Sequence, residues 1–590
     1  MEPQQPRDTT YFRPPTVLEI LLLGLAYLGY LIFNTFVYKP CTSPLKDLPG
    51  PPGGTSRNGH VNDIINMHSN TVLEWIDTYG PTFLVRGPYG VHHRIFTVDT
   101  RALNHVLSHD SIYTKTGIVR RLIRRYIKEG LLVSEGDRHR VQKKVAQKLF
   151  VGNGFKGTGV MVREEAHRLR QVLTELCSNP NLTTPYSPHN ADMPESHREV
   201  DMYKASTRSM FDVIGRVSID HHFNTIGDWE GEGSKLFKKL VHMQQPTGGN
   251  RGLRLLLSLY FPIVDKIWAC DNSNLVNEAM DTLGAIARKT KSERQIEIDQ
   301  GRRESEEDNR DLLTMMLRHN SNESLGHDQK LSDEEIEGQL ATFLFAGSET
   351  TASTLSLGLY HMSCDPAIQT RLRTEILACE GDLPYEQIDE LPYLDAVAKE
   401  IFRMEPAISG TIRQAQKDDI IPLAQPVQLN DGRVVSELKI RKGQLVHVPI
   451  EHLHRSTSIW GPAAGTFDPN RFYSPPLRSS DQIHESASSR SSKRDDGPGI
   501  TSNFMTFLDG PRRCVGYKLA IMEVKLILYT LLREFEFGLV QGGGKILRWN
   551  MLSNRPFVSG TLTSRGSRLP LVIKPYRGDD TAKKDEVEVK

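Results

Sequence analysis

The chain has 590 residues, of which 38% are hydrophobic and 25% are charged, and its formal net charge is +1. This composition is ordinary for a globular protein with a full apolar core. Because the net charge is close to zero, the chain as a whole does not attract nucleic acid, and we exclude nucleic-acid binding. By length alone the chain could hold three or four average domains, although large helical enzymes also fold as one unit.

Six cysteines are scattered over the chain, at positions 41, 177, 270, 364, 379 and 514. None belongs to a CxxC pair or to a His/Cys cluster with zinc spacing. So few cysteines in so long a chain do not indicate a disulfide framework, and a reducing compartment fits them better. Taken alone, each cysteine is most simply a small buried apolar residue.

A long apolar run, VLEILLLGLAYLGYLIFNTFVY, occupies residues 17–38 after a polar tail of residues 1–16. Twenty-two residues at about 1.5 Å each reach roughly 33 Å, enough to cross a hydrocarbon core of about 30 Å. The alternative, a cleaved signal peptide, would have a shorter apolar region and a small-x-small cleavage site, whereas Lys39-Pro40-Cys41 follows here. We predict one transmembrane helix, which the flanking basic residues do not orient.

The linker at residues 39–54 ends in LPGPPGG. Proline fixes φ and holds the preceding residue extended, so we predict a stiff, non-helical spacer; a flexible linker is the alternative. No later linker or repeat divides residues 55–577, which we expect to form one catalytic domain. Residues 474–500 are polar, and we expect them to be a disordered surface insertion, as we do the charged tail 578–590.

Helical periodicity dominates this domain. Apolar residues recur at three- and four-residue spacing over 137–150, 163–176, 202–219, 275–298, 333–364 and 391–404. Short runs at 81–86, 93–98, 427–440 and 569–575 have the pattern of strands. The sequence therefore predicts a mainly α fold with a small β part.

One segment, FLDGPRRCVG, is followed by the helical pattern YKLAIMEVKLILYTLLREF and carries most of the chemical information. It is a loop that delivers Cys514 to the start of a helix, where free backbone N–H groups stabilise the metal-binding thiolate. Gly510 and Gly516 let the backbone approach a flat cofactor closely. Arg512 can reach an anionic propionate, and Phe507 can cover the cofactor face near the sulfur.

FLDGPRRCVG resembles the haem-binding signature of the cytochrome P450 family, in which a phenylalanine, two glycines, a basic residue and the cysteine stand at fixed offsets. All five positions match. The resemblance implies haem b, with Cys514 as the axial ligand of its iron, and a triangular helical prism around the haem. With its apolar N-terminus and spacer, the chain resembles the microsomal, membrane-anchored type of fungi, plants and animals, and we expect a fungal member.

A second family motif, AGSETT, lies within the apolar run that begins near Ile336. In the family it lies on a long helix crossing the distal haem face, where an acid beside an alcohol delivers protons during dioxygen activation. Glu349 and Thr350 match those two positions, so the resemblance implies that they are catalytic. The alternative, a solvated polar helix face, fits poorly because the apolar FLFAG precedes them.

Glu400 and Arg403 lie three residues apart on a predicted helix and can form an ion pair, a common signal on its own. Together with Arg471 they resemble the buried Glu-Arg-Arg network of the family, which implies a structural role around the haem pocket. Arg413, ten residues after Arg403, matches the position that usually contacts a haem propionate.

The segment GDRHRVQKK departs from the family pattern. Where the family commonly has a tryptophan and, four residues later, an arginine facing the propionates, this chain has His139 and Lys143. Both can donate to a carboxylate, although lysine lacks the bidentate fork of arginine. We expect both to contact the haem; a solvated basic face is the alternative.

The resemblance implies a monooxygenase that uses O2 as co-substrate. No dinucleotide-binding glycine fingerprint stands between a strand and a helix, so electrons from NADPH would arrive through a separate NADPH–cytochrome P450 reductase. Basic residues near the proximal side could form its docking face by electrostatic steering; these are Lys143, Lys144, Lys148 and Lys518. The family type also implies the endoplasmic reticulum membrane, crossed once, with the catalytic domain facing the cytosol.

By family position, residues 111–125, 252–262 and the helix near 343–346 shape the substrate pocket. The apolar sequence of 252–262, GLRLLLSLYFP, would dip into a membrane surface, which favours a small lipophilic substrate such as a terpenoid, sterol or fatty acid. Two other functions stay open: a haem-thiolate isomerase or dehydratase without external electrons, and a non-catalytic membrane haem protein. The acid–alcohol pair argues against the isomerase, where proton delivery to oxygen would be idle.

Overall fold

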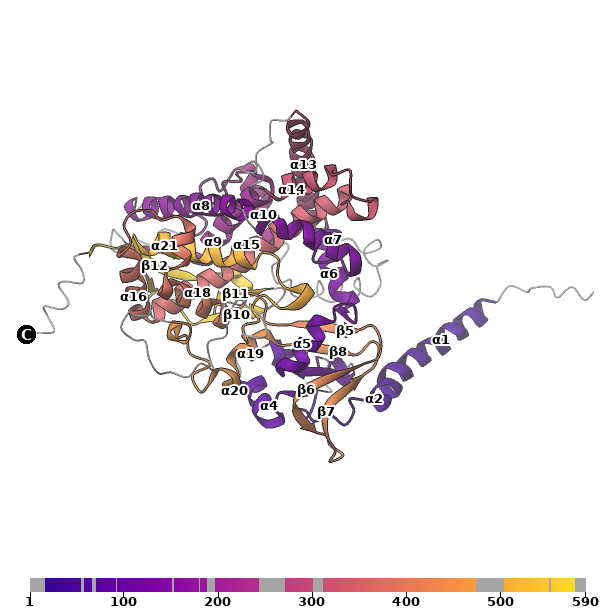
Figure 1. The fold of residues 1–590 in the computed structure, drawn as a ribbon. Helices are drawn as coiled ribbons and strands as arrows, with labels where there is room; N and C mark the ends of the chain where they lie inside the picture. The colour runs from indigo at the N-terminus through magenta and orange to yellow at the C-terminus, as the bar shows by residue number, and fades with distance from the viewer. Residues whose placement is uncertain are drawn as a thin grey trace, which may run out of the picture.

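The computed structural model describes residues 16–54, 58–65, 70–91, 93–150, 153–179, 181–187, 197–242, 271–300, 311–473, 503–550 and 553–578 (Figure 1). The predicted tail 1–16 (except residue 16), the pocket segment 252–262, the insertion 474–500 and the tail 578–590 (except residue 578) lie outside the described residues.

The helices are α1 Val17–Phe33, α2 Lys39–Thr42, α3 Val61–Ile65, α4 Thr71–Tyr79, α5 Thr100–Ser108, α6 Gly117–Ile127, α7 Gly136–Gln147, α8 Asn153–Ser178, α9 Met202–Ile219, α10 Glu232–His242, α13 Asp271–Asp299, α14 Leu312–Ser321, α15 Asp333–Cys364, α16 Pro366–Leu377, α17 Tyr385–Asp389, α18 Pro392–Met404, α19 Ile450–Arg455, α20 Thr457–Trp460, α21 Tyr517–Leu532 and α22 Leu562–Arg565. The strands are β1 Thr82–Val85, β2 Arg94–Thr97, β3 Tyr113–Lys115, β4 Arg198–Asp201, β5 Thr411–Ala415, β6 Asp419–Gln428, β7 Val434–Ile440, β8 Leu445–Val448, β9 Phe535–Leu539, β10 Ile546–Asn550, β11 Asn554–Val558 and β12 Pro570–Pro575. A mainly α fold with a small β part is therefore confirmed.

The predicted elements match these bounds closely where the apolar pattern is strong. Helices α9 and α15 have the predicted limits, and α7 continues into a 3-10 turn, Lys148–Phe150, that reaches the predicted end. The single strand predicted at 427–440 is wrong. Asn430, Asp431 and Gly432 turn the chain there, Gly432 with φ +88°, and the run is divided between the antiparallel strands β6 and β7.

The largest sheet has the strand order β1-β2-β8-β5-β3. Strands β2 and β8 are parallel, and the other neighbours are antiparallel. In the β3–β5 pair, Lys115 stands opposite Arg413. This register brings two cationic side chains together at one edge of the sheet.

Helix α15 contributes to the largest hydrophobic core and packs against both α9 and α21. Its start is fixed by a capping box in which Ser332 and Glu335 exchange side-chain and backbone hydrogen bonds. At Gly347 an added Cβ would meet Ile214 of α9 at 2.7 Å, so the glycine permits close packing of the two helices. The long, capped and buried α15 is thus a rigid support for Glu349 and Thr350.

The predicted continuous transmembrane helix over 17–38 is not found. Within the described part of the chain, no helix combines the length and the apolar character needed to cross a membrane. Over the predicted span, α1 passes without a break in helical backbone into a π-helical segment, Asn34–Tyr38, and then into α2. Helix α1 stands away from the body (Figure 1), and its side chains from Leu21 to Tyr30 are exposed.

The predicted spacer, LPGPPGG at residues 48–54, is non-helical but packs on the body, whereas the linker begins with the helical residues of α2. Leu45 and Leu48 are buried, and the Leu84 N–H on β1 donates to the Pro49 carbonyl at 2.7 Å. An added Cβ at Gly50 would collide with the Leu84 carbonyl. The proline-rich segment therefore fixes where the N-terminal helices leave the domain.

The approach of the α6–α7 connection to α15 generates a stability prediction. An added Cβ at Gly130 would collide with the Thr342 hydroxyl and the Gly338 carbonyl. We expect Gly130→Ala to lower the free energy of unfolding in urea by at least about 2 kcal/mol. The control is Gly117→Ala, whose Cβ would meet only Arg121 at 3.8 Å; equal effects of the two substitutions would contradict the packing argument.

Candidate functional site

The loop before α21 holds Cys514 in a defined position. Its N–H donates to the Phe507 carbonyl at 2.8 Å, and the intervening chain turns through Leu508 and Gly510, both with positive φ. An added Cβ at Gly510 would meet the Leu107 carbonyl at 2.6 Å, so only glycine fits against α5. An added Cβ at Gly516 would meet nothing within 4 Å. The loop is fixed on the α5 side and leaves space beside Gly516.

Cys514 is surrounded by protein closely enough for burial to raise its pKa, and yet its side chain is solvent-accessible. From this combination we infer that the thiol faces a hollow inside the fold. Burial raises its pKa, while the Gly516 N–H and the charges of Lys143 and Arg513 oppose that rise. The surroundings therefore stabilise a thiolate in part, and a bound metal cation would complete this stabilisation.

Lys143 on α7 is attached to this loop. Its ammonium donates to the Pro511 carbonyl at 2.6 Å and to the Arg513 carbonyl at 3.0 Å. The ring of Phe507 is buried between Phe402 and Tyr517, at centroid distances of 5.1 and 6.0 Å. The structure thus uses Lys143 and Phe507 to brace the cysteine loop.

A group of basic side chains, buried or partly buried, adjoins Cys514. Lys143 interacts electrostatically with the thiol and with His139. His139 also interacts with Lys115. Lys115 in turn interacts with Arg413 and Arg512. Burial lowers the pKa of Arg413 to about 10 and depresses that of Lys115 well below its usual value. The structure therefore gathers most of the predicted cofactor contacts into one region.

Arg413 has no carboxylate at ion-pair distance among the described residues. It is 2% exposed, and its guanidinium donates only to Thr411 Oγ1 at 2.7 Å and weakly to the Ile412 carbonyl at 3.4 Å. Arg512 differs, because it pairs with Glu135 and lies 3.6 Å from Asp110. Arg413 is the cation best prepared to bind an external anion.

His139 also retains an unused polar atom. The ring is buried, Nδ1 has no hydrogen-bond partner in the described structure, and burial with the nearby Lys115 and Lys143 lowers its pKa to about 4. A neutral imidazole can still donate one hydrogen bond to an anion. Lys115 was not singled out from the sequence; its position opposite Arg413 depends on a strand pairing that local pattern does not reveal.

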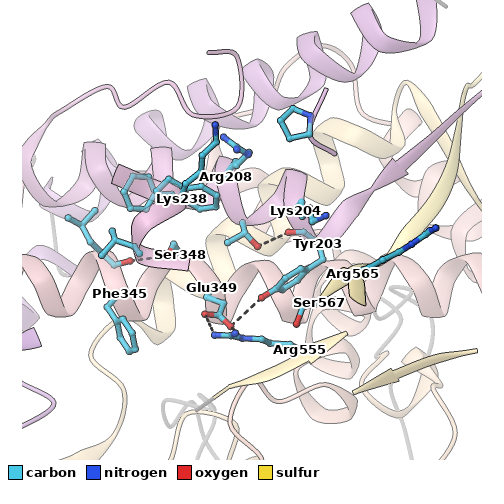
Figure 2. A pocket seen from close by; sticks show the side chains of 16 residues that line it. Tyr203, Lys204, Arg208, Lys238, Phe345, Ser348, Glu349, Arg555, Arg565 and Ser567 are labelled. Carbon is cyan, nitrogen blue, oxygen red and sulfur yellow. Dashed lines mark hydrogen bonds and ion pairs between the residues drawn. The ribbon is translucent and has the colours of Figure 1, made fainter. Parts of the chain in front are cut away.

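Glu349 is buried and its carboxylate is fully engaged (Figure 2). It forms a bidentate ion pair with Arg555, whose Nη2 lies 2.8 Å from Oε2, and accepts from Ser553 Oγ at 2.6 Å and the Tyr203 hydroxyl at 3.2 Å. The neighbouring Thr350 hydroxyl donates to the Ala346 carbonyl at 2.7 Å. The acid and the alcohol are therefore held separately.

A second buried acid links α15 to the helix that follows the cysteine. Glu523 on α21 is 1% exposed, and burial raises its pKa to about 8 against an opposing hydrogen bond from Thr351. It also interacts electrostatically with Cys514. Sequence reasoning missed Glu523, although a lone carboxylate within the apolar pattern of α21 was a usable signal.

The predicted Glu-Arg-Arg residues lie together. Glu400 and Arg403 are both fully buried and form two 2.7 Å hydrogen bonds, and Arg471 Nε lies 3.7 Å from Glu400. Arg403 also donates to the His454 carbonyl at 2.6 Å. The His454 ring accepts from the Met505 N–H at 2.8 Å, at the start of the cysteine loop. This network therefore fixes the start of the cysteine loop through His454 and Met505.

The donor set fits an iron porphyrin. Cys514 offers one soft sulfur ligand to iron, and Arg413, Lys115 and His139 offer donors for its two propionates. The hollow beside Gly516 leaves room for a flat group near the sulfur.

Known proteins are similar to this chain along nearly its whole length. A family model described as Cytochrome P450 matches residues 49–556. Cytochrome P450 monooxygenase 205 of Postia placenta is 30% identical over 570 residues, which cover 95% of this chain and 99% of that protein. Monooxygenase 128 of the same fungus is 30% identical over 561 residues, with 94% and 96% covered. Ganoderic acid synthetase of Ganoderma lucidum is 27% identical over 566 residues, with 90% and 94% covered.

The buried His454 generates a pH prediction. Because Nε2 accepts from Met505, Nδ1 must carry the proton and donate to the Arg403 carbonyl at 3.0 Å. Burial and Arg403 lower its pKa from 6.5 to about 3. Between pH 6.5 and pH 3, His454 therefore binds a proton in the unfolded state but not in the folded state. The free energy of unfolding falls as the pH falls through this range.

We expect His454→Gln to flatten this fall by up to about 1 kcal/mol per pH unit, measured as the free energy of unfolding in urea between pH 6 and pH 4. His327→Gln, at an exposed position, is the control. An unchanged slope in His454→Gln would show that the histidine does not stay neutral in the folded protein.

Proposed function

The chain belongs to the cytochrome P450 family, and we propose that it is a haem-thiolate monooxygenase acting on a lipophilic precursor in fungal secondary metabolism. The observation that carries the proposal is the pairing of Cys514, exposed to an internal hollow, with the buried Arg413, which lacks a carboxylate partner in the described structure. Either feature alone is common. Together they offer a sulfur ligand for the iron of a haem and a cation for its propionates.

Haem, when bound, would supply the iron that binds and reductively activates O2. Cys514 would supply its thiolate ligand, and Arg413 with Lys115 would bind the propionates. Gly516 N–H and Lys143 would keep negative charge on the sulfur, because hydrogen bonds and nearby cations stabilise a thiolate. These residues position the cofactor and tune its ligand.

Helix α15 would supply the groups that handle protons. The Thr350 hydroxyl donates its hydrogen bond to the Ala346 carbonyl. Its lone pairs are therefore available to accept a hydrogen bond from water. Glu349 is fixed by Arg555 and Tyr203. We expect Thr350 to orient the water and Glu349 to take part only when its carboxylate turns away from Arg555.

We infer that electrons come from NADPH through a separate NADPH–cytochrome P450 reductase. Lys144, Lys148 and Lys518 are exposed near the cysteine side and support a basic docking face. Lys143 is less suited to docking, since its ammonium already binds two loop carbonyls.

Membrane association at the endoplasmic reticulum, with the catalytic domain facing the cytosol, belongs to the same proposal. Its support is the exposed apolar surface of α1, where Leu22, Leu23 and Leu25 are more than half exposed. A run of large apolar side chains is unfavourable in water and favourable in lipid. A lipophilic substrate would reach the enzyme from that phase, and the ganoderic acid synthetase among the relatives supports a secondary metabolite as substrate.

The propionate role of Arg413 predicts a change in haem retention. Arg413→Ala removes a buried charge-assisted donor, and we expect haem to transfer to apomyoglobin about tenfold faster. Arg413→Lys, which keeps the charge, should lie between this variant and the wild type. A rate in Arg413→Ala equal to that of the wild type would contradict the assignment.

The reaction is tested with the full chain, reductase, NADPH and isotopically labelled dioxygen on a panel of fungal lipids. We expect a product that carries one labelled oxygen atom and forms only with NADPH; conversion without NADPH would indicate an isomerase or dehydratase instead. Thr350→Ala should form at least about tenfold less product per NADPH oxidised while its haem content stays unchanged. Thr350→Ser, which keeps the hydroxyl, is the matched control.

A further inference from the structure

A cavity that is partly open to solvent lies beside α15 and is also lined by residues of α9, α10, β11 and α22 (Figure 2). Its volume is about 390 Å³, within the range of small-molecule sites. Cys514, Arg413 and Lys115 are not among the described residues that line it, whereas Phe345 and Glu349 of α15 are. Aromatic side chains form its apolar wall, with Phe211, Phe237 and Phe345 among them.

Positively charged side chains outnumber carboxylates around this cavity. Lys204, Arg208, Lys238 and Arg565 line it, and Figure 2 shows them on its upper and right-hand sides. Of the residues described around the cavity, Glu349 alone is a carboxylate, and it is paired with Arg555. Lys204 forms an ion pair with Asp201, which does not line the cavity; Lys204 Nζ lies 3.3 Å from Asp201 Oδ2. The wall therefore carries a surplus of positive charge.

Arg208 shows that the surplus is built into the fold. It is 4% exposed, and its guanidinium donates to the Thr225 carbonyl at 2.8 Å and to Ser234 Oγ at 2.9 Å, both neutral acceptors. It also lies 4.9 Å from the centre of the Phe237 ring. Asp212, the carboxylate that acts on Arg208 electrostatically, accepts from the Thr225 and Ile226 N–H groups instead.

A buried arginine without a carboxylate partner among the described residues costs free energy unless an anion compensates it. We propose that this cavity is a binding site for an amphipathic organic acid. Its carboxylate would lie between Arg208 and Lys238, and its hydrocarbon part would contact Phe211, Phe237 and Phe345. The apolar wall requires a hydrocarbon part, which distinguishes this ligand from an inorganic anion. This site goes beyond the proposed oxygenase function, and it shares with that function the wall residue Glu349.

The test is equilibrium binding to the haem-loaded full chain by titration calorimetry, without NADPH or reductase. We expect dodecanoate to bind about tenfold more tightly than 1-dodecanol and to weaken with added salt. Inorganic phosphate should displace it poorly. Equal affinities for the acid and the alcohol, or displacement by phosphate at concentrations comparable to dodecanoate, would overturn the proposal.

The location is tested with the double variant Lys238→Gln/Arg565→Gln, since both side chains are exposed and their loss should leave the fold intact. We expect it to bind dodecanoate about tenfold more weakly and dodecanol as before. The matched control is Lys239→Gln, a neighbouring cation that pairs with Glu278 at 3.1 Å and does not line the cavity. An unchanged dodecanoate affinity in the double variant, with a shift of the haem absorption band on binding, would place the acid beside the haem and refute this site.

Discussion

The buried guanidinium of Arg403 is the interaction on which the architecture around the cysteine depends. A guanidinium has five N–H groups. Here all five have acceptors: the two oxygens of Glu400 and the carbonyls of His454, Ala464 and Thr466. A lysine could not satisfy this set, and an apolar residue would leave Glu400 charged and buried. The three carbonyls come from chain segments far from α18, so one side chain fixes their relative positions.

The effect of this anchor reaches Cys514 in short steps. Arg403 holds the backbone of His454, and the His454 ring accepts from Met505. Next to Met505, the Thr506 hydroxyl donates to the Phe402 carbonyl at 2.7 Å. The loop then closes through the bond from Cys514 to Phe507. Preorganisation of a metal ligand by supporting hydrogen bonds is expected of a functional site, because a loosely held thiol would bind iron less tightly.

The sequence was most informative where chemistry is local. The cysteine loop lies within ten residues, the Glu-Arg pair within one helical turn, and α15 has a capping box and an unbroken apolar pattern. By contrast, Lys115, Arg555 and Glu523 acquire their roles through contacts with distant segments, and single-sequence patterns carry no information about such partners. The apolar N-terminal run was predicted as one uniform α-helix, and hydropathy alone does not reveal that residues 34–38 are π-helical.

The central claim is that Cys514 is the thiolate ligand of a haem. It is tested most directly by the absorption spectrum of the reduced, carbon monoxide-bound full chain, compared with that of Cys514→Ser. The account predicts the strongly red-shifted band of a thiolate-ligated haem in the wild type and its loss in the variant. Persistence of that band in Cys514→Ser would contradict the assignment.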